Sequence, residues 1–282
     1  MTLQEFIQQL NRWASERVPF LFVIDFELEK PFACKLELAF NEKILYAIRG
    51  RTNFADNFAI AKNVRLEKIP LTLSEYRRKY DLVASGLAYG DSFLTNLTVK
   101  TEIESAATLE ELFFAARAKY KLLFKNQFVV FSPESFIRID GEGVICAFPM
   151  KGTIDASIPH ARELILANPK ELAEHVTIVD LMRNDLSRVA SEVRVERFRY
   201  IDELKTSEKN LLQVSSEIAG RLPENYRMSI GTLLVDLLPA GSVSGAPKPR
   251  TLKIIREAEG ESRGYYAGVF GYLTGKQWIV RS

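Results

Sequence analysis

The sequence has few cysteines. Only Cys34 and Cys146 occur among the 282 residues, far apart and without a CxxC pair or a cysteine/histidine ligand spacing. This scarcity excludes a disulfide framework and a structural zinc site as the basis of the fold. We therefore expect a protein of a reducing compartment, with the cytoplasm as its location.

Long apolar runs are also absent. No segment approaches the roughly 20 apolar residues that a membrane span requires. The N-terminal stretch 1–22 carries Glu5, Arg12, Glu16 and Arg17 instead of the uninterrupted apolar region of a signal peptide. We expect a soluble, unprocessed chain that does not associate with a membrane.

Charge of one sign is not in excess. The 38 basic and 36 acidic residues nearly cancel, so the chain lacks the broad basic surface that nucleic-acid binding needs. An anionic ligand would have to be met by a local site. Hydrolysis through an acyl-enzyme also has no support, because no Ser/His/Asp or Cys/His constellation stands in a persuasive context.

Apolar residues make up 47% of the chain, which is ample for a sizeable core. We find no internal repeat or flexible linker, which favours one domain over two separable ones. Helices and strands alternate without the regular spacing of a doubly wound fold. Helical patterns cover 73–87, 108–120, 158–190 with a break at Asn168-Pro169, and 248–259; strand patterns cover 92–99, 128–131, 194–199, 213–218 and 268–272.

Lys151 lies in the run 148–153, Phe-Pro-Met-Lys-Gly-Thr, where a proline breaks the incoming strand and a glycine frees the outgoing turn. One amine is therefore held at a rigid bend. A surface ammonium is the simpler interpretation of a lone lysine. The motifs around it favour a functional role, and Lys151 is then the residue that decides which reaction the chain runs.

A second candidate cluster lies in the pattern that follows Pro169. Positions three and four apart on a helix share a face, so Glu171, Glu174 and His175 would project together. Mg²⁺ is bound by one or two protein carboxylates together with water and substrate oxygens, so the cluster fits a Mg²⁺ site. A solvated acidic face beside Lys170 is the alternative that the spacing leaves open.

Three further features carry weaker signals. The glycine-rich segment 241–248 precedes a helical pattern, and its backbone N–H groups suit a carboxylate or phosphate, although a tight packing turn is equally compatible. Glu134 follows a strand pattern; it is a candidate general acid or base if it faces the same cavity as Lys151, and otherwise a strand-end carboxylate. Arg183 and Asp185 are positioned for an ion pair that would close the helix end.

Five motifs, taken in this order, resemble those of the chorismate-utilising enzymes: SPESFIRI, PMKGT, EHVTIVDLMRNDLSRVA, GSVSGAPKPR and EAEGESRGYYAGVFGY. This family includes component I of anthranilate synthase and of aminodeoxychorismate synthase, and the isochorismate and salicylate synthases. The match covers about residues 90–272. The resemblance implies an α+β fold like that of anthranilate synthase component I, in which two antiparallel β-sheets pack face to face with helices outside.

The resemblance also implies a Mg²⁺-dependent site for chorismate. Glu174 would be a metal ligand, with Glu171 beside it or coordinating through water, and Glu134 would act with Lys151 in catalysis. Mg²⁺ would clamp one carboxylate of the substrate. The residues implied in binding chorismate itself are Thr153, His175, Gly241, Ser242, Ser244, Gly245 and Arg281.

The residue at position 151 discriminates among the members of the family. Anthranilate synthases usually carry alanine there, whereas aminodeoxychorismate synthases carry lysine, proposed as a covalent nucleophile. The implied reaction is attack of the Lys151 amine, in its neutral form, on C2 of chorismate with loss of the C4 hydroxyl. Isochorismate and salicylate synthases place a water-activating lysine where this chain has Leu94, which also favours an amine product.

These features together indicate component I of an aminodeoxychorismate synthase, acting in p-aminobenzoate and folate synthesis. The chain has no candidate glutaminase nucleophile, so ammonia would come from a separate glutamine amidotransferase subunit. Anthranilate synthase component I is the alternative enzyme. A non-catalytic chorismate-binding or scaffold subunit is the alternative of another class.

The C-terminal end departs from the family pattern. Members normally continue into a GxGI turn and a helix with two metal-binding glutamates, which this sequence does not include. We expect residues 1–282 to form a single chorismate-binding catalytic domain, with a reduced N-terminal part at about 1–88, the motif-bearing core at about 90–272 and an incomplete C-terminal end. Arg281 matches either a substrate-binding arginine or the start of the GxGI strand.

Overall fold

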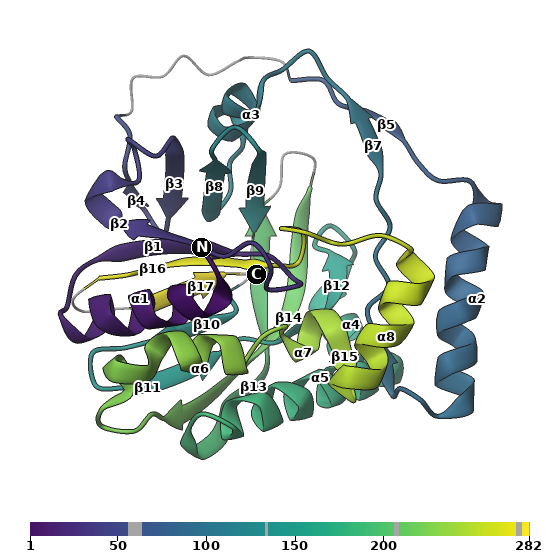
Figure 1. Cartoon of the computed structure of the whole chain (residues 1–282). Helices are drawn as coiled ribbons and strands as arrows, with labels where there is room; N and C mark the ends of the chain where they lie inside the picture. Colours follow the sequence, from purple (N-terminus) through teal and green to yellow (C-terminus); the bar gives the residue numbers. More distant parts are fainter. Residues whose placement is uncertain (56–63, 133–134, 206–208, 275–277, 282) are drawn as a thin grey trace. The chain divides into compact units, whose positions relative to one another are not determined.

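The chain folds into two compact units in a computed structural model that describes residues 1–55, 64–132, 135–205, 209–274 and 278–281 (Figure 1). The first unit combines the chain up to Cys34, the central segment that ends at Ala246, and the chain from Arg263 onward. The second combines the segment that starts at Lys35 with Pro247–Ser262. Each unit therefore joins segments that are far apart in the sequence.

The first unit is built on a sheet that contains nine of the described strands. Their order is β12-β14-β11-β10-β17-β16-β1-β2, and β13 pairs with β14 beside this path. The pairings of β14 with β11, β12 and β13 are antiparallel. The strands are β1 Phe20–Ile24, β2 Phe32–Lys35, β10 Ile137–Ile139, β11 Val144–Ala147, β12 Met150–Asp155, β13 Ser191–Lys205, β14 Asn210–Arg221, β16 Val269–Leu273 and β17 Trp278–Arg281.

Helices cover this sheet, and α5 lies against β12, β13 and β14 (Figure 1). The helix α1 buries Phe6, Leu10 and Ala14, which are four residues apart and therefore form one apolar stripe; α1 packs against α6. The remaining elements of the unit are short. The bounds are α1 Leu3–Ser15, α4 Ala161–Ala167, α5 Pro169–Ser187, η2 Tyr226–Ser229, α6 Ile230–Asp236, α7 Gly241–Ser244 and β15 Gly245–Ala246.

Aromatic side chains form the centre of the core between α1 and the sheet. The rings of Phe6 and Phe22 meet edge to face with centroids 6.2 Å apart, and the rings of Phe22 and Trp278 lie 5.9 Å apart. All three side chains are buried. The core thus ties the first helix to β1 and β17, two strands that are far apart in the sequence.

The second unit contains a four-stranded sheet in the order β4-β3-β8-β9 and a two-stranded sheet of β5 and β7. The helices α2 and α8 pack on one another through a small cluster of Val83, Ile254 and Ala258. The bounds are η1 Leu36–Leu38, β3 Ile44–Ile48, β4 Arg51–Thr52, β5 Glu67–Ile69, α2 Leu73–Tyr89, β6 Leu94–Thr95, β7 Glu102–Glu104, α3 Leu109–Ala115, β8 Tyr120–Phe124, β9 Phe128–Ser132 and α8 Lys248–Glu259.

The predicted α+β class is confirmed, and so are the helices at 73–87, at 158–190 with its break, and at 248–259. The helix predicted over 108–120 was too long, because α3 ends at Ala115 and Tyr120 already begins β8. The strand predicted over 92–99 shrinks to Leu94–Thr95. None of the helices in the described part of the chain has the length and apolar character needed to span a bilayer.

Candidate functional site

A β-bulge places Lys151 at the centre of the candidate site. Met150 pairs with Ser215 and Thr153 with Gln213, so β12 advances three residues while β14 advances two. The extra residue falls at Lys151-Gly152, and Gly152 has a φ of +94°, in the region that favours glycine. A bulge turns a side chain out of the regular alternation of a strand and is common beside active sites.

Two side chains donate hydrogen bonds to the carbonyl oxygens of Lys151 and Gly152 at the bulge. Nδ1 of His175 lies 3.2 Å from the Lys151 carbonyl oxygen, and Nε2 of Gln213 donates to the Gly152 carbonyl oxygen at 2.8 Å. A carbonyl only accepts, so Nδ1 of His175 carries the proton and Nε2 accepts from the Ser216 hydroxyl at 2.8 Å. The bulge is therefore fixed by specific polar partners.

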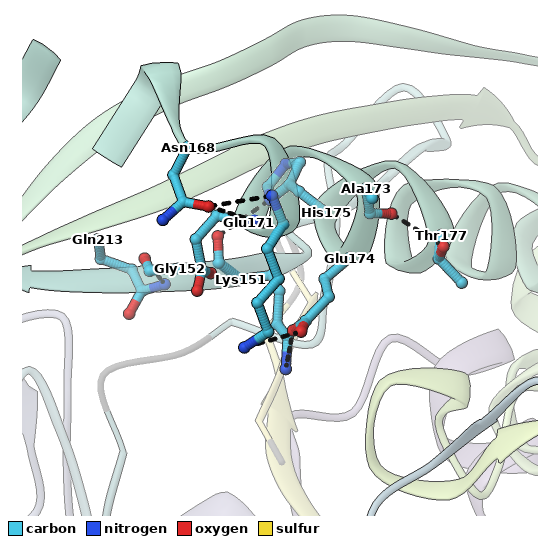
Figure 2. A network of polar contacts seen from close by, with 10 residues as sticks. Lys151, Gly152, Asn168, Glu171, Ala173, Glu174, His175, Thr177 and Gln213 are labelled. Carbon is cyan, nitrogen blue, oxygen red and sulfur yellow. Dashed lines mark hydrogen bonds and ion pairs between the residues drawn. The ribbon is translucent and has the colours of Figure 1, made fainter. Parts of the chain in front are cut away.

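The Lys151 amine meets the carboxylate of Glu174 on α5 (Figure 2). Nζ lies 3.1 Å from Oε2 of Glu174, and Nζ of Lys170 lies 3.3 Å from Oε1 of the same carboxylate. The hydrogen bond from Lys151 lowers the pKa of Glu174, partly opposed by desolvation and supported by the charges of both lysines. Lys151 and Glu174 are 40% and 31% exposed, so a ligand from solvent can reach both side chains.

Glu171 lies beside the same bulge. A Cβ at position 152 would come within 3.0 Å of Oε2 of Glu171, so the glycine lets the carboxylate approach the backbone. The donor set near Lys151 is thus two carboxylates, while the ring of His175 points into the sheet. In the part of the chain that the structure describes, no group of three or more His, Cys, Asp or Glu side chains is arranged to hold a metal.

Two carboxylates fit Mg²⁺ better than they fit a metal that needs a complete protein cage. Mg²⁺ retains water and takes substrate oxygens beside one or two carboxylates, and hard oxygen donors suit it. Glu174 and Glu171 would hold the ion. When bound, it would supply positive charge for a carboxylate of the substrate.

The glycine-rich segment 241–245 lies in the same unit, next to α5. The N–H of Gly241 donates to Oδ2 of Asp185 at 3.1 Å, and a Cβ at Gly241 would come within 3.0 Å of that oxygen. The hydroxyl of Ser244 is fully buried and donates to the Ala240 carbonyl oxygen at 2.9 Å. Ser242 is only partly buried, and Gly245 has a φ of +110°.

The other predicted site residues are placed as follows. Thr153 is exposed on β12 and donates to Oε1 of Gln213 at 2.6 Å. Arg281 ends β17, where it pairs with Phe270 of β16; its side chain is outside the described part. Glu134 lies outside the described residues. The structure thus brings together Lys151, Glu171, Glu174, His175 and Thr153.

One family model, described as chorismate binding enzyme, matches residues 60–280. The chain belongs to the chorismate binding enzymes. This confirms the family predicted from the five motifs. The match begins in the second unit and extends through the bulge, α5 and the glycine-rich segment.

Relatives of this chorismate binding enzyme occur among curated proteins and solved structures. An uncharacterized PabA-like protein of Haemophilus influenzae is 48% identical, covering 98% of this chain and 83% of that protein. Anthranilate synthase component 1 of Arthrobacter globiformis is 33% identical, covering 71% of this chain and 40% of that protein. A putative isochorismate synthase, DhbC, from Bacillus anthracis has a TM-score of 0.69 at 17% identity, covering 99% of this chain and 78% of that chain, which shows the fold.

The contacts that three polar residues of the enzyme make were missed from the sequence. Gln213 and Ser216 hold the bulge from β14, and Asp185 holds Gly241. Asp185 was expected to pair with Arg183, whose guanidinium instead lies 2.7 Å from Asp180. Gln213 and Ser216 could have been found from the polar residues in the predicted strand 213–218. A strand that is buried on both faces is ordinarily apolar, so polar residues there indicate specific partners.

The acid stability of the enzyme should depend on His175. Burial lowers the pKa of His175 from 6.5, an effect that the nearby charge of Arg199 adds to and the bond to the Lys151 carbonyl opposes. As pH falls below about 6.5, the unfolded chain takes up this proton before the folded one, so the free energy of unfolding decreases toward the folded pKa. We expect Tm to fall over this range in the wild type and to fall less in His175→Gln. The exposed His160, changed to Gln, is the control; equal slopes in all three proteins would contradict the expectation.

Proposed function

We propose that this enzyme is component I of an aminodeoxychorismate synthase, which replaces the C4 hydroxyl of chorismate by an amino group with Mg²⁺ as cofactor. The observation that carries the proposal is the Lys151 amine, held on a bulge and 3.1 Å from Glu174 in a part of the fold flanked by a second carboxylate. Leu94, where relatives that add water would carry a lysine, supports an amine as the incoming group.

In the proposed reaction Lys151 acts as the nucleophile. Nζ forms a bond to C2 of chorismate, the ring double bonds shift, and the C4–oxygen bond breaks. The departing hydroxyl takes a proton, for which Glu134 is the proposed donor, and leaves as water. Ammonia then bonds to C4, the double bonds shift back, and the C2–Nζ bond breaks to regenerate the lysine.

Lys151 is proposed to attack in its neutral form, and the carboxylate of Glu174, at hydrogen-bond distance, orients its amine. Thr153 and the segment 241–245 are proposed to contact chorismate. The ammonia is proposed to come from a glutamine amidotransferase subunit, because both cysteines of this chain are buried and neither is placed as a glutaminase nucleophile.

Product analysis tests the proposal. Incubation with chorismate, ammonium and Mg²⁺ should give 4-amino-4-deoxychorismate, which an added lyase converts to p-aminobenzoate. Anthranilate fluorescence without added lyase would instead indicate anthranilate synthase, the activity named for several relatives that are 32% to 40% identical. Chorismate binding without any product would favour the scaffold alternative.

A further inference from the structure

We infer that His175, Ser216 and Arg199 form a positioning chain that sets the backbone of Lys151, so that His175 acts on the reaction through the main chain and not by touching the substrate. The inference rests on the proposed function, because it concerns the nucleophile of that reaction. It departs from the expectation that His175 binds chorismate.

The first argument is that His175 has no free polar atom. Its side chain is 0% exposed, although the neighbouring Glu174 on α5 is 31% exposed. Nδ1 is taken by the Lys151 carbonyl at 3.2 Å and Nε2 by the Ser216 hydroxyl at 2.8 Å. A substrate hydrogen bond to this ring would break one of these contacts.

The second argument is that the hydrogen bonds have a single direction. The backbone N–H of Arg199 donates to Oγ of Ser216 at 2.9 Å, so the Ser216 hydroxyl keeps its proton for Nε2 of His175. The Lys151 carbonyl accepts from Nδ1. One neutral tautomer of His175 therefore satisfies the Ser216 hydroxyl, both ring nitrogens and the Lys151 carbonyl at once.

The third argument is that the backbone is irregular at both ends of the positioning chain, at Arg199 and at Lys151. Arg199 has a φ of +50° and lies where the register of β13 shifts between Arg197 and Tyr200. Its guanidinium donates to the carbonyl oxygens of Leu166 and Ile165 at 2.9 and 3.1 Å, which fixes it on the last turn of α4. Strained backbone of this kind persists only where its surroundings define it fully.

Ser216 links the bulge to the central strand twice. Its N–H donates to the Pro149 carbonyl oxygen at 3.0 Å, two residues before Lys151, and its hydroxyl reaches the Lys151 carbonyl through His175. Both sides of the turn that carries the amine are thus held by one residue of β14. Loss of His175 would release the Lys151 carbonyl, and a displacement of about 1 Å at a reacting group costs roughly 10²-fold in rate.

Three variants test the positioning chain. His175→Leu removes the donor to Lys151, His175→Asn keeps an N–H near the place of Nδ1, and Ser216→Ala removes the hydroxyl between Arg199 and the ring. We expect His175→Leu to lower kcat by about 10²-fold with little change in KM, and Asn to recover at least about tenfold of that loss. The rate at which the covalent chorismate adduct forms on Lys151, followed by mass spectrometry in the absence of ammonia, should fall by the same factor as kcat. Ser216→Ala should lie between Leu and wild type, and His160→Asn should match wild type.

A readout without turnover separates this inference from the proposed function. Trace acylation of the free enzyme, resolved lysine by lysine, compares Lys151 with the exposed Lys170. We expect the ratio of the two labelling rates to change by more than about threefold in His175→Leu and to stay near wild type in His175→Asn. A changed ratio supports the inferred positioning chain even if the wild-type enzyme makes another product. An unchanged ratio, an Asn variant no better than Leu, or a rise in KM alone would overturn it. If His175→Leu does not fold, a kcat of Ser216→Ala below wild type at unchanged KM supports the inference, and a wild-type kcat in Ser216→Ala overturns it.

Discussion

Replacement of Lys151 by alanine is expected to lower the rate of 4-amino-4-deoxychorismate formation by about 10³-fold or more, because the variant has no amine to form the covalent intermediate. The mass of wild-type enzyme mixed with chorismate should show an adduct on Lys151, and the variant should show none. Turnover with saturating ammonium, measured by coupled formation of p-aminobenzoate, gives the rate.

Lys170→Ala is the matched control for this variant. Lys170 pairs with the same Glu174 carboxylate at 3.3 Å but is 75% exposed, so its removal changes the charge around Glu174 without removing the proposed nucleophile. We expect its activity to stay within about threefold of wild type, since exposed ion pairs contribute little. Wild-type turnover in Lys151→Ala, or an equal loss in both variants, would refute the covalent role.

Local signals were sufficient to predict the helix that carries the carboxylates. Asn168 caps α5, accepting from the N–H groups of Lys170 and Glu171 at 3.0 and 3.2 Å, and Pro169 occupies its first position. These are the residues from which the break was predicted, since a cap and a proline at the first helical position depend only on the adjacent chain.

The bulge at Lys151 could be predicted only as a bend. Pro149 and Gly152 indicated a break in the strand, but the extra residue exists only relative to the register of β14, which lies some sixty residues further along the chain. For the same reason the partners Gln213 and Ser216 were missed. The helical spacing predicted that Glu174 and His175 project together. Adjacent residues are about 100° apart on a helix, however, and the sheet covers His175 but not Glu174.

Replacement of Glu174 by glutamine is expected to lower activity by about 10³-fold, the other large effect predicted for this site. The amide has nearly the same shape and still accepts a hydrogen bond from Lys151, but it lacks the charge that binds a hard cation. If Glu174 is the proposed metal ligand, its loss removes several kcal/mol of transition-state stabilisation, which corresponds to a factor of this size. Activity as a function of Mg²⁺ concentration should shift to much higher concentration in Glu174→Gln, and chelation should abolish wild-type activity.

The ion pairs of Glu174 allow its two possible roles to be separated. If Glu174 only orients Lys151, then Glu174→Gln should lower turnover while the Mg²⁺ dependence stays at its wild-type position. If it is a metal ligand, the lysines and the cation compete for one carboxylate, because Lys151 and Lys170 lie 3.1 and 3.3 Å from its two oxygens. Removing either lysine should then tighten Mg²⁺ binding, measured by calorimetry in the presence of chorismate, whereas Glu174→Gln should weaken it. Unchanged Mg²⁺ affinity in all three variants would remove Glu174 from the metal site and leave the ion pair with Lys151 as its function.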